Sequence, residues 1–287
     1  MRNLVRVSMM LLAGILIFVT ACNENDDSAK AGKGTVVIKL TDAPFPVSLV
    51  DQALVTIDKI EIRSTVEVEN AEGEIENETL YTVLFEGEKV VDLLDLQNGI
   101  TTDLISMDID AGSYDLIRMH VTSSEVILKD GTSFDLKIPS GSASGLKIKI
   151  TPELVVESGV ESEVLLDFDV SKSFMVQGNM NTPAGIKGFM FKPVIRAMCQ
   201  KYSGVIEGKV FENVTTPVAE AHVQIIVADT VYSSALTDAT GSYSLIGLPA
   251  GSYKMVCEKE AYTPVLVDLV TVKARETTVQ DFLLILK

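Results

Sequence analysis

Two stretches of the chain contain the same tetrapeptide, Ala-Gly-Ser-Tyr: "IDAGSYDLIRM" at residues 109–119 and "LPAGSYKMVCE" at residues 248–258. In the second stretch apolar residues alternate directly from Tyr253. In the first, the alternation after Tyr114 is displaced by one residue, so a β-bulge or an outward-facing Tyr114 is needed. The sequences around the two copies do not align at length. The repeat therefore predicts one structural device used in two different domains, not a duplicated domain.

The body of the chain consists of short apolar-alternating segments separated by Gly, Asn, Asp and Pro. The clearest hairpin is "EVILKDGTSFDLKI" (residues 125–138), in which Asp130-Gly131 separates two alternating arms. An acidic stretch, "EVENAEGEIENE" (residues 67–78), is expected to be a loop. Helix and strand are hard to separate only in residues 90–107. We predict an all-β fold of two consecutive β-sandwich (Ig-like/transthyretin-like) domains.

Residues 34–199 resemble the bacterial lipoprotein family known as domain of unknown function 4382. The resemblance rests on dispersed stretches that follow one another in the order of that family: "VIKLTDAP", "VVDLLDLQNG", "DAGSYDLIRM", "DGTSFDLKIPSG", "SGLKI", "LLDFDVSKSF" and "FKPVI". Each stretch is weak alone, and together they are specific. The resemblance implies no activity, since the family has none assigned.

Residues 203–287 resemble the carboxypeptidase regulatory-like modules, which have a transthyretin-like sandwich. The matching pieces are "GVIEGKVFE", "PVAEAHVQI", "ALTDATGSYSLIGLPAGSYKMVCEKEAYTP" and "TVQDFLL". We interpret two residues of these motifs as turn devices: Asp238, whose carboxylate bonds back to its own turn, and Gly241 with a positive φ. In the two Ala-Gly-Ser-Tyr copies, Gly112 and Gly251 are interpreted as making tight turns. Such modules commonly serve as non-catalytic spacers or interaction domains. Their likeness to carbohydrate-binding sandwiches is an analogy of fold alone.

The N-terminus predicts a lipoprotein signal peptide at residues 1–21. Arg2 and Arg6 precede an apolar run too short for a comfortable membrane span, which ends in Val19-Thr20-Ala21-Cys22. This pattern resembles a bacterial lipobox, and the alternative is an ordinary secretory signal with an incidental Cys. We expect lipid on Cys22 to attach the protein to a membrane. A flexible lipidated tether follows over residues 22–33, and outer-membrane localisation, facing the periplasm or the cell surface, is expected.

The chain is strongly acidic, with a formal net charge of −16 that removal of Arg2 and Arg6 would change to −18. Such a charge repels phosphate backbones, so no nucleic-acid partner is expected. An envelope protein or a glycan remains open as a partner. Of the three cysteines, Cys199 and Cys257 would be left after lipidation; an oxidising compartment permits a disulfide between them, but we favour none.

Scattered carboxylates provide the only metal candidates. Asp167 and Asp169 in "LLDFDVS" share a strand face with Ser171, as Asp108 and Asp110 do in "SMDIDAG". With Asp42 from another strand, Asp167 and Asp169 are candidate Ca²⁺ ligands. Alternation on a half-solvated strand explains the same spacing, and we favour that interpretation, so no metal or other cofactor is expected.

The sequence contains no recognisable catalytic motif. Its two histidines, His120 and His222, have no second His or Cys at zinc-ligand spacing. "GSASG" at residues 141–145 has Ala at the position that a nucleophilic Ser would need. There is no Trp, and the four tyrosines considered as sugar platforms are more typical of half-buried sandwich residues; they are Tyr81, Tyr202, Tyr232 and Tyr262.

We therefore predict a non-catalytic, lipid-anchored cell-envelope protein for display, adhesion or scaffolding. The alternative is a carbohydrate-binding accessory lipoprotein that uses its C-terminal sandwich domain. An enzyme ranks third, because it would require an acid–base pair that the dispersed carboxylates do not suggest.

Overall fold

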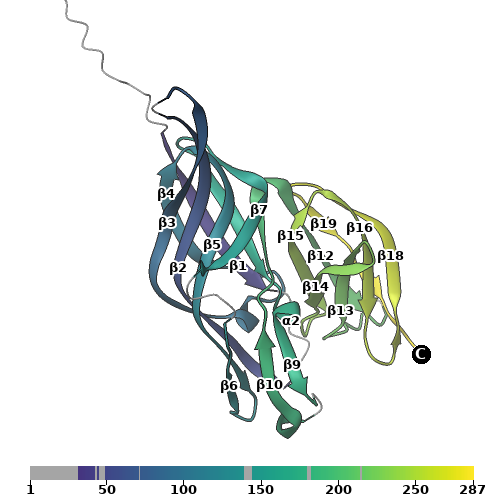
Figure 1. Cartoon of the computed structure of the whole chain (residues 1–287). Helices are drawn as coiled ribbons and strands as arrows, with labels where there is room; N and C mark the ends of the chain where they lie inside the picture. The colour runs from purple at the N-terminus through teal and green to yellow at the C-terminus, as the bar shows by residue number, and fades with distance from the viewer. Residues whose placement is uncertain are drawn as a thin grey trace, which may run out of the picture. The chain divides into compact units, whose positions relative to one another are not determined.

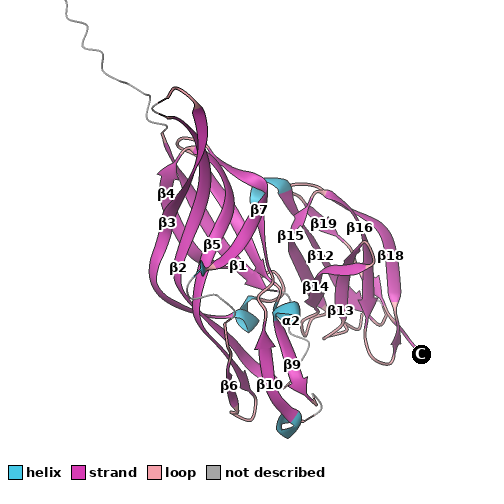
Figure 2. Ribbon diagram, viewed as in Figure 1, coloured by secondary structure: helices cyan, strands magenta, loops and turns pink. Residues whose placement is uncertain are grey.

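β-branched and apolar residues alternate with polar ones along most of the chain, and these segments form strands. The computed structural model describes residues 32–42, 44, 49–70, 72–138, 144–179, 182–213 and 215–287. The expected signal peptide, Cys22 and nearly all of the tether lie outside the described residues. Residues Ala31–Lys287 form one compact unit. Helical turns within its described part are four residues long or shorter (Figure 2): η1 (Leu93–Leu96), α2 (Val170–Ser173), η2 (Pro183–Gly185) and η3 (Gln200–Tyr202).

A large mixed sheet forms the first half of this unit (Figure 1). Its order is β3-β2-β5-β7-β11-β8-β1-β4, and β6 pairs with β5. The strands are β1 (Lys33–Asp42), β2 (Val50–Glu69), β3 (Ile75–Asp92), β4 (Thr102–Asp110), β5 (Gly112–Leu128), β6 (Ser133–Asp135), β7 (Leu146–Val156), β8 (Glu161–Phe168) and β11 (Ile195–Cys199). A separate two-stranded sheet contains β9 (Phe174–Gly178) and β10 (Ile186–Phe191).

The large sheet curls around a single hydrophobic core. Alternate residues of its strands point inward, for example Ile38 of β1, Ile62 of β2 and Ile117 of β5, each with an exposed fraction of 0%. The two edge strands approach each other: Lys89 of β3 donates from Nζ to the Asp103 carbonyl of β4 at 2.7 Å. A charged side chain thus covers backbone groups that an open sheet edge would expose.

The second half of the unit is a sandwich of two smaller sheets around its own core. One sheet has the order β15-β12-β19, with β20 paired to β12, and the other has the order β14-β13-β16-β18. Buried residues from both sheets, such as Ile206, Leu245, Ile225 and Met255, pack together. The strands are β12 (Ser203–Phe211), β13 (His222–Val227), β14 (Thr230–Leu236), β15 (Ser242–Pro249), β16 (Gly251–Glu258), β17 (Tyr262–Thr263), β18 (Val265–Val272), β19 (Thr277–Val279), β20 (Phe282–Leu283) and β21 (Ile285–Leu286). The all-β sandwich prediction is confirmed.

The two Ala-Gly-Ser-Tyr copies are the same device in two cores. The hydroxyl of Tyr114 donates to the carbonyl of Asp110 at 2.7 Å, and that of Tyr253 donates to the carbonyl of Pro249 at 2.6 Å, four residues back in both cases. The strand register shifts immediately after each Tyr, towards β7 in the first copy and towards β18 in the second. Of the two alternatives predicted for Tyr114, the bulge is found, and the ring is buried.

Gly112 and Gly251 do not make tight turns of the left-handed kind. Each is the first residue of a strand, and neither has a positive φ. A Cβ at Gly112 would meet nothing within 4 Å, so steric crowding does not require glycine there. Instead, each Tyr hydroxyl bonds to the carbonyl four residues back and so stabilises the change of chain direction between the two strands. We call this segment the corner.

The acidic stretch is mostly strand, contrary to the expectation of a loop. Glu67–Glu69 end β2 and Ile75–Glu78 begin β3, so only a short turn separates them. The hairpin around Asp130-Gly131 is confirmed: Val126 pairs with Phe134, and Gly131 has a φ of +84°. The ambiguous residues 90–107 divide into the end of β3, the turn η1 and the start of β4.

Candidate functional site

The three aspartates considered as calcium ligands lie close together in the fold. Strands β1 and β8 are parallel neighbours, and Thr41 lies beside Asp167 in their register, with Asp42 one residue further along. Asp42 accepts a hydrogen bond through Oδ1 from the backbone N–H of Val170 at 3.0 Å. This contact places the end of β1 against the first residue of α2, directly after Asp169.

Asp169 caps the short helix α2. Its Oδ1 accepts from the Lys172 backbone N–H at 3.1 Å and from the Ser171 hydroxyl at 2.6 Å. Its Oδ2 pairs with Lys172 Nζ at 2.7 Å, while the side chain of Asp169 is almost fully buried. A carboxylate at this position satisfies free N–H groups of the first turn and complements the partial positive charge there.

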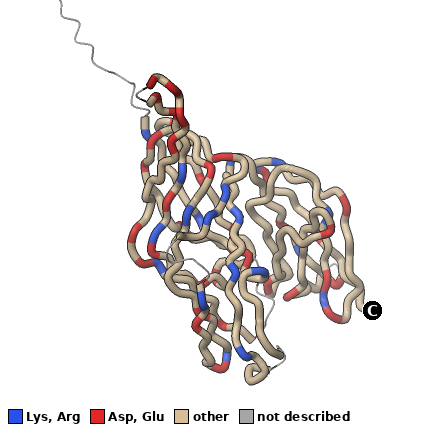
Figure 3. Tube along the Cα trace, in the orientation of Figure 1, with Lys and Arg blue, Asp and Glu red and all other residues tan. Residues whose placement is uncertain are grey.

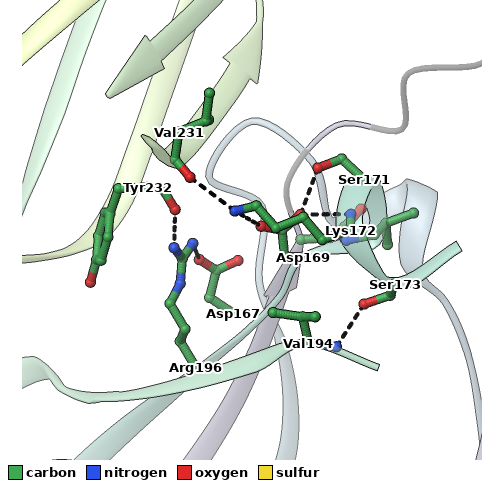
Figure 4. Close-up of polar contacts among 11 residues, drawn as sticks. Asp167, Asp169, Ser171, Lys172, Ser173, Val194, Arg196, Val231 and Tyr232 are labelled. Atoms are coloured by element: carbon green, nitrogen blue, oxygen red, sulfur yellow. Dashed lines mark hydrogen bonds and ion pairs between the residues drawn. The ribbon is translucent and has the colours of Figure 1, made fainter. Parts of the chain in front are cut away.

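Lys172 also connects the two cores. Its Nζ donates to the carbonyl of Val231 in β14 at 3.0 Å, as Figure 4 shows. One ammonium group therefore neutralises a buried carboxylate of the first core and satisfies a backbone carbonyl of the second.

Arg196 of β11 makes the second polar connection (Figure 4). Its guanidinium donates through Nη2 to Asp167 and through Nη1 to the carbonyl of Tyr232. It also lies over the Tyr232 ring, with Cζ 4.4 Å from the ring centroid. Burial raises the pKa of the Asp167 carboxyl, although the adjacent guanidinium acts to lower it. Removing Arg196 would leave a desolvated carboxylate without its partner.

This arrangement is better suited to joining two cores than to holding Ca²⁺. A calcium ion takes six to eight oxygen ligands, and the charge it would supply is already provided by Arg196 and Lys172. Within the part of the chain that the structure describes, no three or more His, Cys, Asp or Glu side chains form a group that could hold a metal ion. We call the cluster of Asp167, Asp169, Lys172 and Arg196, with the Val231 and Tyr232 carbonyls, the polar junction.

A second contact between the cores comes from the Asn98-Gly99 turn. Asn98 Oδ1 accepts from the backbone N–H of Ser244 at 2.7 Å, on β15 at the edge of its sheet. Both turn residues have positive φ, 60° and 81°. A Cβ on Gly99 would lie 2.7 Å from the Ser244 hydroxyl oxygen, so close approach and backbone conformation both favour glycine.

A separate groove of about 670 Å³ is lined by residues other than those of the polar junction and the Asn98-Gly99 turn. It is lined mainly by polar and charged residues, with Lys39, Glu163 and Tyr202 from the first half of the unit and Arg275 from the second. Lys39 and Glu163 form an ion pair at 2.8 Å within it.

The other candidate residues have structural surroundings. His120 Nε2 lies 3.3 Å from Glu61 Oε2, and His222 Nδ1 lies 2.9 Å from Gln224 Nε2. The four tyrosines considered as sugar platforms are all partly buried. Tyr232 and Tyr262 pack against the second core, Tyr202 packs against the first, and the Tyr81 ring lies under the Arg118 guanidinium.

Cys199 and Cys257 are free and belong to different cores. Burial raises the pKa of the Cys199 thiol to about 11 and that of Cys257 to about 12. At neutral pH both are therefore thiols, which are poor nucleophiles and poor metal ligands.

Asp238 binds its own turn. Its Oδ1 accepts from the Thr240 N–H at 2.8 Å, from the Thr240 hydroxyl at 2.7 Å and from the Ser242 N–H at 2.9 Å. These hydrogen bonds, led by that of the Thr240 side chain, lower the pKa of the Asp238 carboxyl. Gly241, in the same turn, has a φ of +74°.

Sequence reasoning missed the roles of Arg196 and Lys172, and it marked Asn98-Gly99 only as a turn pair, without its contact to the second core. Their partners are 29 to 146 residues away along the chain or are backbone carbonyls and N–H groups, apart from the local Lys172–Asp169 contact. Only the i, i+3 spacing of Asp169 and Lys172 carried a signal in the sequence. None of the helices in the described ranges is long and apolar enough to span a lipid bilayer.

Fold and junction together define a class: an all-β protein with two packed cores joined by partly buried polar contacts. The chain belongs to the family described as "Domain of unknown function (DUF4382)", whose model matches residues 33–193. A carboxypeptidase regulatory-like domain follows at residues 205–285. The resemblance to these two families, in this order, is confirmed.

A search of curated protein sequences gave no match. Among solved structures, the chain is similar to the Bacillus anthracis TIE protein at 11% identity, covering 89% of this chain and 34% of that one, with a TM-score of 0.25. It therefore spans about a third of the length of that protein. It is also similar to BcpA, the major pilin subunit of Bacillus cereus (11%, 89% and 71%, TM-score 0.23), and to the shaft pilin SpaA from Lactobacillus rhamnosus GG (8%, 89% and 98%, TM-score 0.28). These low scores carry no functional inference.

Proposed function

We propose that this protein is a non-catalytic, lipid-anchored module for display, adhesion or scaffolding at the cell envelope. The observation that carries the proposal is the polar junction. Its charged groups, the buried Asp169 and the partly buried Asp167 and Arg196, are engaged in contacts that hold elements of the two cores together. Groups held this way serve assembly, because their hydrogen-bonding capacity is directed at the protein itself.

The junction also supports the division into domains at residues 34–199 and 203–287. Two hydrophobic cores and two family matches lie on either side of the short segment between them. The contacts of Arg196, Lys172 and Asn98 would keep the two domains in a fixed relation. Such a module would present its surfaces at a defined orientation, which suits display or scaffolding.

The anchor in this proposal is Cys22, the last residue of Val19-Thr20-Ala21-Cys22. A lipid there, followed by the polar residues 23–33, would place the two domains beyond the membrane surface without a membrane-spanning helix. We propose the outer membrane as the site, facing the periplasm or the cell surface.

The test is expression of the full chain and of Cys22→Ala, with Thr20→Ala as the matched control that keeps the Cys and a small residue beside it. We expect palmitate labelling and membrane partition for the wild type and Thr20→Ala, and soluble, unlabelled protein for Cys22→Ala. Equal membrane partition of all three would refute the anchor. Protease treatment of intact cells then distinguishes the two faces: digestion indicates surface display, and protection indicates the periplasm.

A second candidate function is carbohydrate binding as an accessory lipoprotein. The groove of about 670 Å³ favours it, because its size is that of a small-ligand site and it combines Tyr202 with charged groups such as Arg275 of the C-terminal domain. A glycan array would test this candidate. It requires a reproducible hit that Tyr202→Ala abolishes and that Tyr262→Ala, at a site outside this groove, leaves unchanged.

A further inference from the structure

The hairpin of β2 and β3 extends beyond the sheet that contains it. β5 pairs with β2 only as far as Ser64, opposite Tyr114. Beyond that point Thr65–Glu69 pair only with Ile75–Thr79. All residues of Ile75–Thr79 are exposed. We call these two segments, with Glu72 and Glu74 at the turn, the acidic arm. A two-stranded ribbon without a third strand or a packed face is marginally stable in water, so the arm gains from any surface that covers it.

The acidic arm combines negative charge with exposed apolar side chains. It contains no Lys or Arg, and among the described residues none of its six glutamates forms an ion pair. Ile75 is 71% exposed, and Leu80, directly after the arm, is 42% exposed. In Figure 3 this end of the hairpin is the most densely acidic part of the first domain. The glutamates are Glu67, Glu69, Glu72, Glu74, Glu76 and Glu78.

The outer face of the adjoining sheet carries the opposite charge. The register of β2, β5 and β7 aligns Arg63, Leu116 and Lys149 in one row. The next row on the same face is Glu61, Arg118 and Lys147. The row between these two consists of Ile62, Ile117 and Ile148, which point to the opposite side of the sheet, into the core.

This basic face, defined by Arg63, Arg118, Lys147 and Lys149, has more positive charge than its own acids neutralise. Glu61 pairs with Arg118 at 3.4 Å, and Asp115 pairs with Arg63. Lys147 and Lys149 form no ion pair with another described residue. Figure 3 shows blue segments over β5 and β7 in a chain whose net charge is −16.

Lys147 lies directly opposite Arg118 in the β5–β7 register. Like charges at such positions destabilise a sheet, and an added anion would relieve the repulsion. Arg118 is held in place, because its guanidinium lies 3.7 Å from the centroid of the Tyr81 ring. The face is therefore a pre-ordered surface for carboxylates.

We propose that two copies of this chain associate through these two surfaces, the acidic arm of each lying on the basic face of the other. The arm and the face are consecutive parts of one ribbon, since Arg63 precedes Thr65 by two residues on β2. A straight ribbon cannot bring its own arm onto its own face. Two ribbons placed antiparallel about a two-fold axis bring both arm–face pairs together at once, as a closed dimer requires.

The test measures the mass of the compact unit Ala31–Lys287 by light scattering and sedimentation. We expect a dimer at about 10 mM salt, where the Debye length is about 30 Å, and dissociation near 1 M, where it is about 3 Å. A wild-type chain that is monomeric at low salt, or a dimer indifferent to salt, would overturn the proposal.

Two charge-reversed variants make the test specific. K147E/K149E has an acidic face and an acidic arm. E67K/E69K/E72K/E74K has four lysines against two remaining glutamates in the arm, so it has a basic arm and a basic face. Glu67 and Glu69 lie on the same strand face as Arg63, and all six positions are exposed, so folding, checked by circular dichroism, is preserved. We expect each variant alone to dimerise at least about tenfold more weakly than the wild type. An equimolar mixture of the two should form heterodimers, because both arm–face pairs are again oppositely charged. Association of either variant at wild-type strength, or absence of heterodimers in the mixture, would contradict the assignment.

Discussion

Replacing Tyr114 by Phe removes one hydroxyl and changes nothing else in the shape of the side chain. In the structure that hydroxyl donates to the Asp110 carbonyl at 2.7 Å, and Tyr114 is only 4% exposed. Water therefore has little access to the carbonyl that the variant would leave without this donor. We expect Tyr114→Phe to lower the free energy of unfolding, with the loss confined to the first core.

The size of this effect follows from the geometry. A typical intramolecular hydrogen bond contributes a net 0.5 to 1.5 kcal/mol, and burial of the Tyr114 hydroxyl places it near the upper end, at about 1.5 kcal/mol. Tyr253 makes the same bond to Pro249 at 2.6 Å, but its side chain is only partly buried. For Tyr253→Phe we therefore expect a smaller loss, about 0.5 to 1 kcal/mol.

Urea unfolding of wild type, both single variants and the double variant at neutral pH provides the assay. Because the two tyrosines lie in different cores, the two losses should add. If Tyr114→Phe leaves the midpoint unchanged, the hydroxyl does not stabilise the corner. If Tyr253→Phe is the more damaging change, burial does not set the magnitude.

The pH dependence gives an independent check. Burial raises the pKa of Tyr253 to about 12 and also raises that of Tyr114. Because the folded pKa of Tyr253 lies above the unfolded value of about 10, its contribution is complete below pH 10 and declines as the pH rises towards 12. The stability difference between wild type and Tyr253→Phe should therefore shrink across that interval; a constant difference would contradict the assignment.

Three further predictions concern other parts of the fold. Arg196→Met should lower the free energy of unfolding by about 2 to 3 kcal/mol. This is less than the roughly 3 to 5 kcal/mol for breaking a fully buried pair, because the side chains of Arg196 and Asp167 keep some exposure. The variant should also separate the unfolding transitions of the two cores in urea; a single transition at the wild-type midpoint would refute the role of the junction. Asp115→Asn should lower the free energy of unfolding by up to about 1 kcal/mol at neutral pH, because the hydrogen bond from Arg63 lowers the pKa of Asp115 in the folded protein. This contribution is present above about pH 4 and is lost as the pH falls. The melting temperatures of wild type and Asp115→Asn should therefore converge at acidic pH. Asp238→Ala should cost about 1 to 2 kcal/mol by leaving turn N–H groups without their acceptor, whereas Asp238→Asn, which keeps an acceptor oxygen, should lose less in the same urea titration.

Local chemistry was sufficient to predict much of the fold. Alternation of apolar residues marked the strands, and Asp130-Gly131 marked a hairpin because glycine readily adopts the positive φ that the turn needs. The displaced alternation after Tyr114 predicted a bulge or an outward-facing Tyr114, because a period of two cannot shift by one residue without an extra residue in one strand. The structure selects the bulge. The acidic stretch was misjudged as a loop, because repeated Glu suggests solvent exposure and a ribbon exposed on both faces looks the same in sequence.

The candidate site divides in the same way. The spacing of Asp167 and Asp169 predicted one strand face for both, and only the calcium hypothesis, which was not the favoured one, added Asp42. In the structure β8 ends at Phe168, and Asp169 is buried as the cap of α2. What those carboxylates do depends on Arg196 and on carbonyls of β14, which come from other parts of the chain. No spacing rule connects residues 29 or more positions apart whose only relation is that two sheets bring them together.

The sequence alone determined most of the strand content, the turn at Asp238 and Gly241, and the two family patterns, because each depends on residues within a few positions of one another. Tertiary structure alone decided that the carboxylates meet cations, that the two cores share a polar junction, and that a basic face adjoins an acidic arm. These relations depend on strand order and register, which pairing of β2, β5 and β7 fixes only after distant segments have come together. The Ala-Gly-Ser-Tyr repeat spans both levels: its Tyr hydroxyl bond is local, while the burial that gives the bond its value comes from the core.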